Sequence, residues 1–376
     1  MIAWLLISFF VLLFLGVPIA MSLGLSAMGG ILFLGGGSTV TIAQRMFEGM
    51  NSFALLAIPL YTFAGFTMSK GGISKRLMDF CYSIVGHIYG GLAHVNVLSS
   101  MIFAGISGSA VADTAGVSGM FMPEMVRKGY SKNFTVAVTA ISSTIGIIIP
   151  PSIPMVVIAG ICGISTGKLF LGGIIPGVLC GLAQMIVSYF MAKKEGVPKE
   201  PGHFTIGPVL HGLWESWPAL LMPIIIVGTI TMGIVSPTEA GVIAVVYGLF
   251  AGGIIYRELK WEDIKFAFAE TVRTSGRIFI VIGAAKLYTV MLTTAGFDKW
   301  VAKTMLGFST NPTVILIVIL LIFFIVTMFM ESIATLTLFM PILYPIALGV
   351  GINPIVLSVL ITVVIGVGLV TPPVGM

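Results

Sequence analysis

Charged residues are scarce in this sequence. Asp, Glu, Lys and Arg make up 9% of the 376 positions, against roughly 25% in an ordinary soluble domain. Hydrophobic residues make up 57%, which is more apolar surface than a soluble fold of this size can bury. Residues 1–34, 218–256 and 313–329 carry almost no charge, and each is long enough to cross a hydrocarbon core of about 30 Å. We therefore expect an all-α polytopic membrane protein embedded in a lipid bilayer.

Cysteines and the common catalytic motifs are also scarce or missing. The three cysteines, Cys81, Cys162 and Cys180, have no CxxC spacing, so we expect buried thiols rather than a metal site or disulfides. The sequence contains neither a Walker A pattern nor an HExxH motif, which argues against nucleotide hydrolysis and zinc-dependent proteolysis. We expect no enzyme activity and no cofactor. Any energy coupling would then come from an ion gradient or from another chain.

The basic residues indicate how the chain is oriented in the membrane and do not indicate a nucleic-acid site. The net charge is +5, but the basic side chains lie in short segments between apolar stretches. Lys193 and Lys194 follow one such stretch, and Arg257 and Lys260 follow another. Because positively charged loops tend to stay in the cytoplasm, both clusters are predicted to be cytoplasmic, and no binding to nucleic acid is expected. The apolar first segment has no basic leader, so we interpret it as a retained membrane helix.

The chain is predicted to consist of two similar halves. A polar segment containing Pro198, Pro201 and Pro208 lies near the middle, and we expect these prolines to interrupt any helix there. Each half would contain scaffold helices, one re-entrant helical hairpin and one helix interrupted by a Pro-Pro pair. The N-terminal half is predicted at 1–192, with its hairpin at about 88–126 and its broken helix at about 132–162. A cytoplasmic, polar and amphipathic linker follows at 193–217. The C-terminal half is predicted at 218–376, with its hairpin at about 311–348 and its broken helix, which is incomplete, at about 353–376.

Two internal matches support these halves. SAVADTAGVSGMFMP (109–123) aligns without gaps to TMFMESIATLTLFMP (327–341), in a register that pairs Asp113 with Glu331. A second match, at a slightly larger offset, pairs Gly146 with Gly368 and places a Pro-Pro pair at the same position in each half. Interrupted helices at matching positions are typical of transporters, where they form the binding site.

The loops after the two hairpins differ in charge. Arg127, Lys128 and Lys132 lie in the first, whereas residues 341–356 contain no Lys or Arg. The first loop is therefore predicted to be cytoplasmic and the second external, so the repeats would be inverted. The second half stops at Met376, three residues after its Pro-Pro pair, and we expect that its final half-helix has been lost by truncation.

Asp113 and Glu331 are the candidate chemical groups within these membrane segments. A carboxylate at the membrane centre costs about 2.5–3.5 kcal/mol on insertion scales, so such residues usually face the bundle interior and often bind an ion or substrate. Alternatively, each acid caps the helix that returns from the hairpin tip. The two roles are compatible. Around Asp113, Ser107 and Ser109 add hydroxyl oxygens, and the Pro-Pro pairs deprive earlier carbonyls of their helical partners; a partly dehydrated sodium ion needs such oxygens. Lys286 is the one basic residue that could meet a carboxylate at depth, but we expect it to snorkel to an interface.

At this point the sequence resembles the large membrane subunit of tripartite ATP-independent periplasmic (TRAP) transporters, in the wider ion transporter superfamily. The motifs that carry the resemblance are SFALLAIPLYTFAG (52–65), GISGSAVADTAG (105–116), IIIPPSIPM (147–155), SPTEAG (236–241) and GLVTPPVGM (368–376). The resemblance implies an elevator transporter of the bacterial inner membrane, driven by sodium. It also implies two partners: a small Q-type membrane subunit and a periplasmic binding protein that delivers a small carboxylate. C4-dicarboxylates, sialic acid and similar sugar acids are the implied substrates, and sialic acid is favoured.

The resemblance also assigns residues to sites. Substrate would lie near Ser109, Asp113 and Glu331. One sodium site would involve Ser107, Ser109, Gly146, Ile149 and Pro150, and a second would involve Thr327, Gly366, Gly368, Thr371 and Met376.

Two other functions fit parts of the pattern. A stand-alone sodium/dicarboxylate symporter would share the hairpins and broken helices without needing partners. A membrane transferase for a lipid-linked sugar would use the membrane acids as catalysts, but catalysis gives no reason to duplicate the site in inverted repeats.

Overall fold

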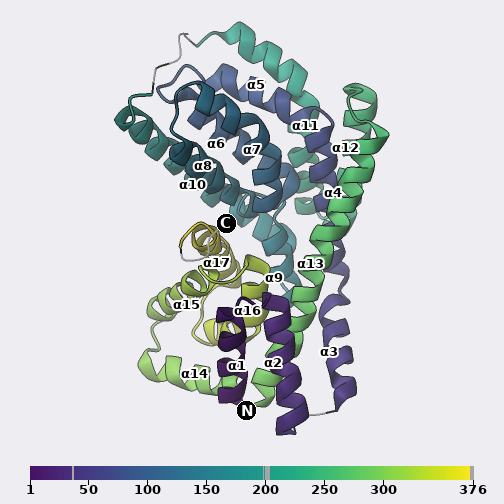
Figure 1. The fold of residues 1–376 in the computed structure, drawn as a ribbon, viewed down its shortest axis with the longest axis vertical. Coiled ribbons are helices and arrows are strands. Elements are labelled where there is room, and N and C mark those ends of the chain that lie inside the picture. Colours follow the sequence, from purple (N-terminus) through teal and green to yellow (C-terminus); the bar gives the residue numbers. More distant parts are fainter. Residues whose placement is uncertain (36–37, 198, 200–203, 373–376) are drawn as a thin grey trace. The chain divides into compact units, whose positions relative to one another are not determined.

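The computed structural model describes residues 1–35, 38–197, 199 and 204–372, and these residues form helices and no strand (Figure 1). The predicted all-α membrane fold is therefore confirmed. The helices group into two compact units. Among the described residues, the first unit contains 1–56, 156–165 and 274–372, and the second contains 57–155 and 166–273.

The first unit combines N-terminal and C-terminal helices. Its core packs Leu5 and Phe9 against Ala284 and Tyr288, and the Tyr288 hydroxyl donates a hydrogen bond of 2.9 Å to the Leu5 carbonyl. Its helices are α1 (Ile2–Phe14), α2 (Ile19–Leu34), α3 (Thr39–Met50), the 3-10 turn η1 (Phe53–Leu56), α14 (Phe297–Phe308), α15 (Pro312–Thr327), α16 (Ser332–Gly349) and α17 (Pro354–Leu369).

The N-terminal stretch differs from the single membrane helix that we predicted. It forms two helices, α1 and α2, of 13 and 16 residues, which pack side by side (Figure 1). The first helix ends before Gly16, which has a left-handed backbone with φ of +80°. Pro18 then lacks the amide hydrogen that a continuing helix would need. Local backbone chemistry therefore divides a segment whose hydropathy is continuous.

The second unit contains the first hairpin and its broken helix. Its core packs Val95 of α6 against Phe121 and Met125 of α7 and Val138 of α8. Two further helices, α9 (Ile153–Cys162) and α13 (Trp261–Thr294), contribute residues to both units. The remaining helices of this unit are α4 (Ala57–Lys70), α5 (Ile73–Val85), α6 (Gly91–Ser107), α7 (Ala110–Arg127), α8 (Lys132–Ser143), the 3-10 turn η2 (Thr144–Ile147), α10 (Thr166–Lys194), α11 (Ile206–Thr231), α12 (Pro237–Phe250) and the π turn η3 (Ala251–Ile255).

A ladder of buried polar side chains joins α6 to α8. Asn96 donates to the Thr139 hydroxyl at 2.9 Å and accepts from the Ser142 hydroxyl at 3.2 Å. One turn further along α6, Ser100 donates to Ser142 at 3.1 Å. Because buried polar groups must find partners, this ladder fixes the register of the hairpin on the broken helix.

Six helices among the described residues are long and apolar enough to cross a membrane, by length and composition. They are the segments 53–70, 166–194, 206–231, 237–255, 261–294 and 332–349.

Helices extend into the predicted linker at 193–217 from both ends. Helix α10 continues to Lys194 and α11 begins at Ile206. Pro208 lies in the first turn of α11, where a missing amide hydrogen costs no helical bond. Pro198 and Pro201 lie outside the described residues.

Two of the predicted cytoplasmic clusters lie together in the second unit. The Ser131 hydroxyl, in the turn between α7 and α8, donates to the Glu195 carboxylate at 2.9 Å. The basic residues Arg127 and Lys132 therefore lie at the same end of this unit as Lys193 and Lys194. This agrees with one shared membrane face for both clusters, while the inverted topology stays a prediction.

Two helix N-caps in each half have the same spacing. The N-cap residues Ser109 and Ser131 of the first half have the same separation in sequence as the N-caps Glu331 and Asn353 of the second. In addition, α7 and α16 each contain 18 residues. The structural equivalent of Glu331 is therefore Ser109, so the pairing of Glu331 with Asp113 from the sequence was wrong by about one helical turn.

Candidate functional site

The tip of the first hairpin is a short turn between α6 and α7. Helix α6 ends at Ser107, and Gly108 takes the left-handed backbone, with φ of +64°, that only glycine adopts readily. Ser109 then caps α7, because its hydroxyl accepts from the amide of Ala112 at 3.4 Å. The tip therefore presents two serine hydroxyls within three residues.

Asp113 lies inside this tip and is fully buried. The Ser107 hydroxyl donates to Asp113 Oδ1, and Ser107 also accepts from the Ser109 amide at 3.3 Å. Asp113 Oδ2 has no hydrogen-bond partner among the described residues. Since Ser109 is the N-cap, Asp113 does not cap α7, and the capping alternative is excluded for this residue. A buried carboxyl oxygen with no protein partner can receive a ligand.

Gly146, in η2, lies directly against the Asp113 carboxyl group. A Cβ atom added to Gly146 would collide with Asp113 Oδ2 and would lie 3.3 Å from the Ser109 carbonyl carbon. The sequence placed Ser109 with Gly146 in a sodium site and with Asp113 in a substrate site, and the structure brings all three residues together.

The break in the first helix lies against the same tip. The chain leaves η2 at Ile147, passes through a cis Pro150–Pro151 bond, and re-enters a helix at Ile153. The Ile153 amide donates to the Gly108 carbonyl at 3.0 Å, which ties the break to the hairpin. Because Pro150 has no amide hydrogen, it cannot donate to the Gly146 carbonyl one turn earlier.

Sequence reasoning missed Ser152, which follows the proline pair. Its hydroxyl donates to the Ile147 carbonyl at 2.5 Å and accepts from the Met155 amide at 3.3 Å. Pro151 deprives the Ile147 carbonyl of its usual helical donor, and Ser152 replaces that donor. The available signal was a hydroxyl residue directly after Pro-Pro, since Ser is a common helix N-cap.

The second set of predicted sodium residues lies in the first unit. A Cβ atom on Gly368 would lie 2.7 Å from Thr327 Cβ, so α15 and α17 approach closely there. Gly366 is buried in α17, and the Thr371 hydroxyl donates to the Val367 carbonyl at 2.7 Å. Met376 lies outside the described residues. The structure thus brings Thr327 and Gly368 together, without an acidic group in their contact.

Glu331 has the capping role that we gave as the alternative. Its Oε2 accepts from the amides of Ile333 at 3.0 Å and Ala334 at 3.4 Å, and its Oε1 accepts from the Ser332 hydroxyl at 2.8 Å. The residue is exposed, unlike buried Asp113. The two acids therefore differ in kind: Glu331 caps the start of a helix, whereas Asp113 lies inside a packed oxygen cluster.

The described residues contain no group of three or more His, Cys, Asp or Glu side chains that could hold a metal ion. The cysteines are free thiols, of which Cys81 is buried and the other two are half-buried. The oxygen cluster at the first hairpin consists instead of the Ser107 hydroxyl, the Asp113 carboxyl group and nearby backbone carbonyls. Such oxygens are hard ligands, which suit alkali and alkaline-earth ions.

Comparison with known proteins identifies the family. The model of the tripartite ATP-independent periplasmic transporter DctM component matches residues 6–376. The chain is 38% identical over 367 residues to the isethionate TRAP transporter permease protein DctMQ of Oleidesulfovibrio alaskensis, covering 98% of this chain and 58% of that protein. It is 36% identical over 365 residues to the sialic acid TRAP transporter large permease protein SiaM of Vibrio cholerae, covering 97% of this chain and 85% of that protein.

Further comparisons agree. The C4-dicarboxylate large permease protein DctM of Pseudomonas aeruginosa is 37% identical, with 94% of this chain and 83% of that protein covered. The fold resembles the crystal structure of the Alcanivorax borkumensis YdaH transporter, with a TM-score of 0.54, 13% identity, and coverage of 87% of this chain and 77% of that one. The relatives are transport proteins rather than enzymes, as the sequence predicted. This chain belongs to the DctM family of tripartite ATP-independent periplasmic transporter components.

Proposed function

We propose that this chain carries a small organic acid across the bacterial inner membrane and that sodium ions drive the uptake. The named substrates of its relatives are isethionate, sialic acid and C4-dicarboxylates, and all of these are anions at neutral pH. An anion must move against the negative interior potential, which costs about 2.3 kcal/mol per charge at 100 mV. Co-transport of sodium ions would offset that cost.

The oxygen cluster at the first hairpin tip is the observation that carries the sodium proposal. Ser107 contributes a hydroxyl, Asp113 a buried carboxyl oxygen without a protein partner among the described residues, and Gly146 a carbonyl whose proline neighbour cannot donate to it. These groups bind a dehydrated cation well because they are small, hard donors. We include Ser109, Ile149 and Pro150 in the same proposed site.

The remaining predicted site residues are part of this proposal. A second sodium ion would bind at Thr327, Gly366, Gly368, Thr371 and Met376, with support from the close approach of Thr327 and Gly368. Substrate would bind near Ser109, Asp113 and Glu331. The amides of Ile333 and Ala334 already donate to the Glu331 carboxylate, so they would not be available to a substrate. Glu331 would act on the substrate through its negative charge and through the position it gives to α16.

The proposal extends to movement and partners. We propose an elevator cycle, in which the hairpins and broken helices move together relative to the scaffold helices. A small Q-type membrane subunit would hold the scaffold, and a periplasmic binding protein would deliver the substrate. Support comes from the tripartite family itself and from the hydrogen bond that ties Gly108 to Ile153.

Reconstitution in proteoliposomes tests this function. Vesicles would contain this chain together with the small membrane subunit, and uptake of labelled succinate, isethionate or sialic acid would be measured with the cognate binding protein. We expect uptake with an inward sodium gradient and almost none when choline replaces sodium at constant pH. Equal uptake in both buffers would refute sodium coupling. Robust uptake by this chain alone would refute the need for partners and favour the stand-alone sodium/dicarboxylate symporter.

A further inference from the structure

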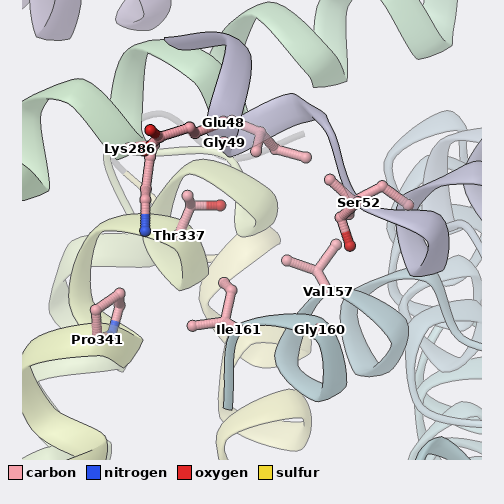
Figure 2. Close-up of a pocket in the computed structure, with 11 residues that line it drawn as sticks. Glu48, Gly49, Ser52, Val157, Gly160, Ile161, Lys286, Thr337 and Pro341 are labelled. Carbon is pink, nitrogen blue, oxygen red and sulfur yellow. The ribbon is translucent and has the colours of Figure 1, made fainter. Parts of the chain in front are cut away.

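The first unit contains a cavity that is separate from the residues of the predicted sites (Figure 2). Its volume is about 220 Å³, and it is lined from α3, α9, α13 and α16. The polar lining includes Lys286 of α13, Thr337 of α16 and Ser52, which follows α3. On the opposite wall, Val157, Gly160 and Ile161 of α9 provide an apolar surface.

Lys286 is held so that its ammonium group reaches this cavity. A Cβ atom on Gly49 would lie 2.6 Å from Lys286 Cβ and 3.0 Å from its Cγ. The bare backbone of α3 therefore packs on the stem of the lysine. In Figure 2 the Lys286 side chain extends toward Thr337 and Pro341 of α16. The snorkelling of Lys286 to an interface stays a prediction.

The charge of Lys286 has no counterion among the described residues. Glu48 also lines the cavity, but its carboxylate pairs with Arg45 of the same helix at 2.8 Å. Neither a hydrogen bond nor an ion pair to Lys286 is found within the described part of the chain. An anion in the cavity would stabilise this half-buried ammonium group beside the apolar wall.

Polar groups of α16 line the cavity together with Lys286. Thr337 donates its hydroxyl to the Ile333 carbonyl at 2.8 Å, so its oxygen can still accept. Two prolines of α16, Pro341 and Pro345, lack the amide hydrogens that would bond the carbonyls of Thr337 and Pro341. The cavity thus offers an anion one positive charge from Lys286 and a hydroxyl donor from Ser52, and its acceptors suit a hydroxyl group or a water molecule that accompanies the anion.

We propose that this cavity binds the anionic group of a small organic acid, with Lys286 as its countercharge. The proposal rests on the proposed transport function for the class of ligand, and it gives the transported acid a second binding position besides the one proposed near Ser109, Asp113 and Glu331. The volume lies below the roughly 300–1,000 Å³ of pockets for drug-sized molecules. It therefore favours an acid with few carbon atoms, such as a C4-dicarboxylate or isethionate, over a nine-carbon sugar acid.

Binding to the purified protein tests the site without a sodium gradient or partners. Titrations of succinate and of isethionate would compare the native chain with Lys286→Gln, Lys286→Arg and the control Lys303→Gln, which changes an exposed lysine on α14 of the same unit. We expect Lys286→Gln to weaken binding about 10- to 100-fold, equivalent to about 1.4–2.8 kcal/mol at 1.4 kcal/mol per tenfold. Lys286→Arg should retain more affinity than Lys286→Gln, and the Lys303 variant should match the native chain.

A second measurement uses the native protein, so it does not depend on a variant that folds. A small amine-acylating reagent would be applied with and without succinate, and mass spectrometry would give the modification rates of Lys286 and Lys303. We expect succinate to slow modification of Lys286 and not of Lys303. Equal affinity of the native and Lys286→Gln proteins, or no protection of Lys286, would overturn the proposal.

Two outcomes separate this site from the transport mechanism and from lipid binding. Binding that depends on Lys286, together with uptake that does not need sodium, would refute sodium coupling and support the anion site. Protection of Lys286 by phosphatidylglycerol vesicles but not by succinate would assign the cavity to a lipid phosphate and overturn the proposal.

Discussion

Replacing Ser107 with alanine isolates one oxygen of the proposed sodium site. The hydroxyl donates to Asp113 Oδ1 and accepts from the Ser109 amide at 3.3 Å. Its removal leaves both oxygens of a fully buried carboxyl group without a donor, since Oδ2 already has none among the described residues. The packing of the tip is retained, because Gly65 of α4 lies against Ser107 Cβ and Cα, which alanine keeps.

The size of the effect follows from those contacts. A hydrogen bond to a charged group contributes about 1.5–3 kcal/mol, and a direct contact of the hydroxyl with the ion would add to this. At about 1.4 kcal/mol per tenfold, the sodium concentration for half-maximal uptake should rise by about 10- to 100-fold. Maximal uptake at saturating sodium should change less, because the substrate contacts remain.

Sodium activation curves of uptake, measured in proteoliposomes containing the complete assembly, would give this value. Ser100→Ala is the matched control, since Ser100 is equally buried in α6 and donates to Ser142 at 3.1 Å, away from the tip. We expect the control to lower thermal stability slightly and to leave sodium activation unchanged. Identical curves for the native and Ser107→Ala proteins would refute the assignment of the ion to this tip.

Three other sets of substitutions test separate parts of the structure. Gly146→Ala places a methyl group against the Asp113 carboxyl and should abolish sodium-driven uptake, whereas Gly119→Ala, with nothing within 4 Å, should behave like the native protein. Glu331→Ala removes the N-cap of α16 and should cost about 0.5–2 kcal/mol of stability in thermal unfolding; a variant as stable as the native protein would argue against the cap. In intact cells freed of native cysteines, an impermeant thiol reagent should label Val356→Cys and not Asn133→Cys; labelling of both positions would contradict inverted repeats.

Much of the fold could be predicted because its interruptions are local. Glycine and proline determine helix ends through backbone geometry and missing amide hydrogens, without reference to distant residues. Helices α6–α7, α15–α16 and α8–α9 occupy the segments in which we predicted two hairpins and a broken helix. The division of residues 1–34 could have been predicted for the same reason, since Gly16 and Pro18 were present in the sequence.

The roles of individual side chains were harder to predict. The match of Phe-Met-Pro in both halves set a false register, because the structural partner of Pro123 is Pro345, which lies equally far along its helix from the N-cap. Asp113 and Glu331 consequently looked equivalent, although one is buried and the other caps a helix. The orientation of the Lys286 side chain could not be predicted for a different reason. It depends on contact with Gly49 of another helix, and no local sequence pattern reveals that contact.

The ladder between α6 and α8 makes sliding of one helix on the other a discontinuous process. A shift by one helical turn, about 5.4 Å, would break the bonds of Asn96, Ser100 and Ser142 at the same time. In water each lost bond could be replaced by solvent, but within hydrocarbon no such replacement exists. The hairpin and its broken helix are therefore mechanically coupled. When one of them moves, the other moves with it, and the two helices do not occupy registers between the bonded ones.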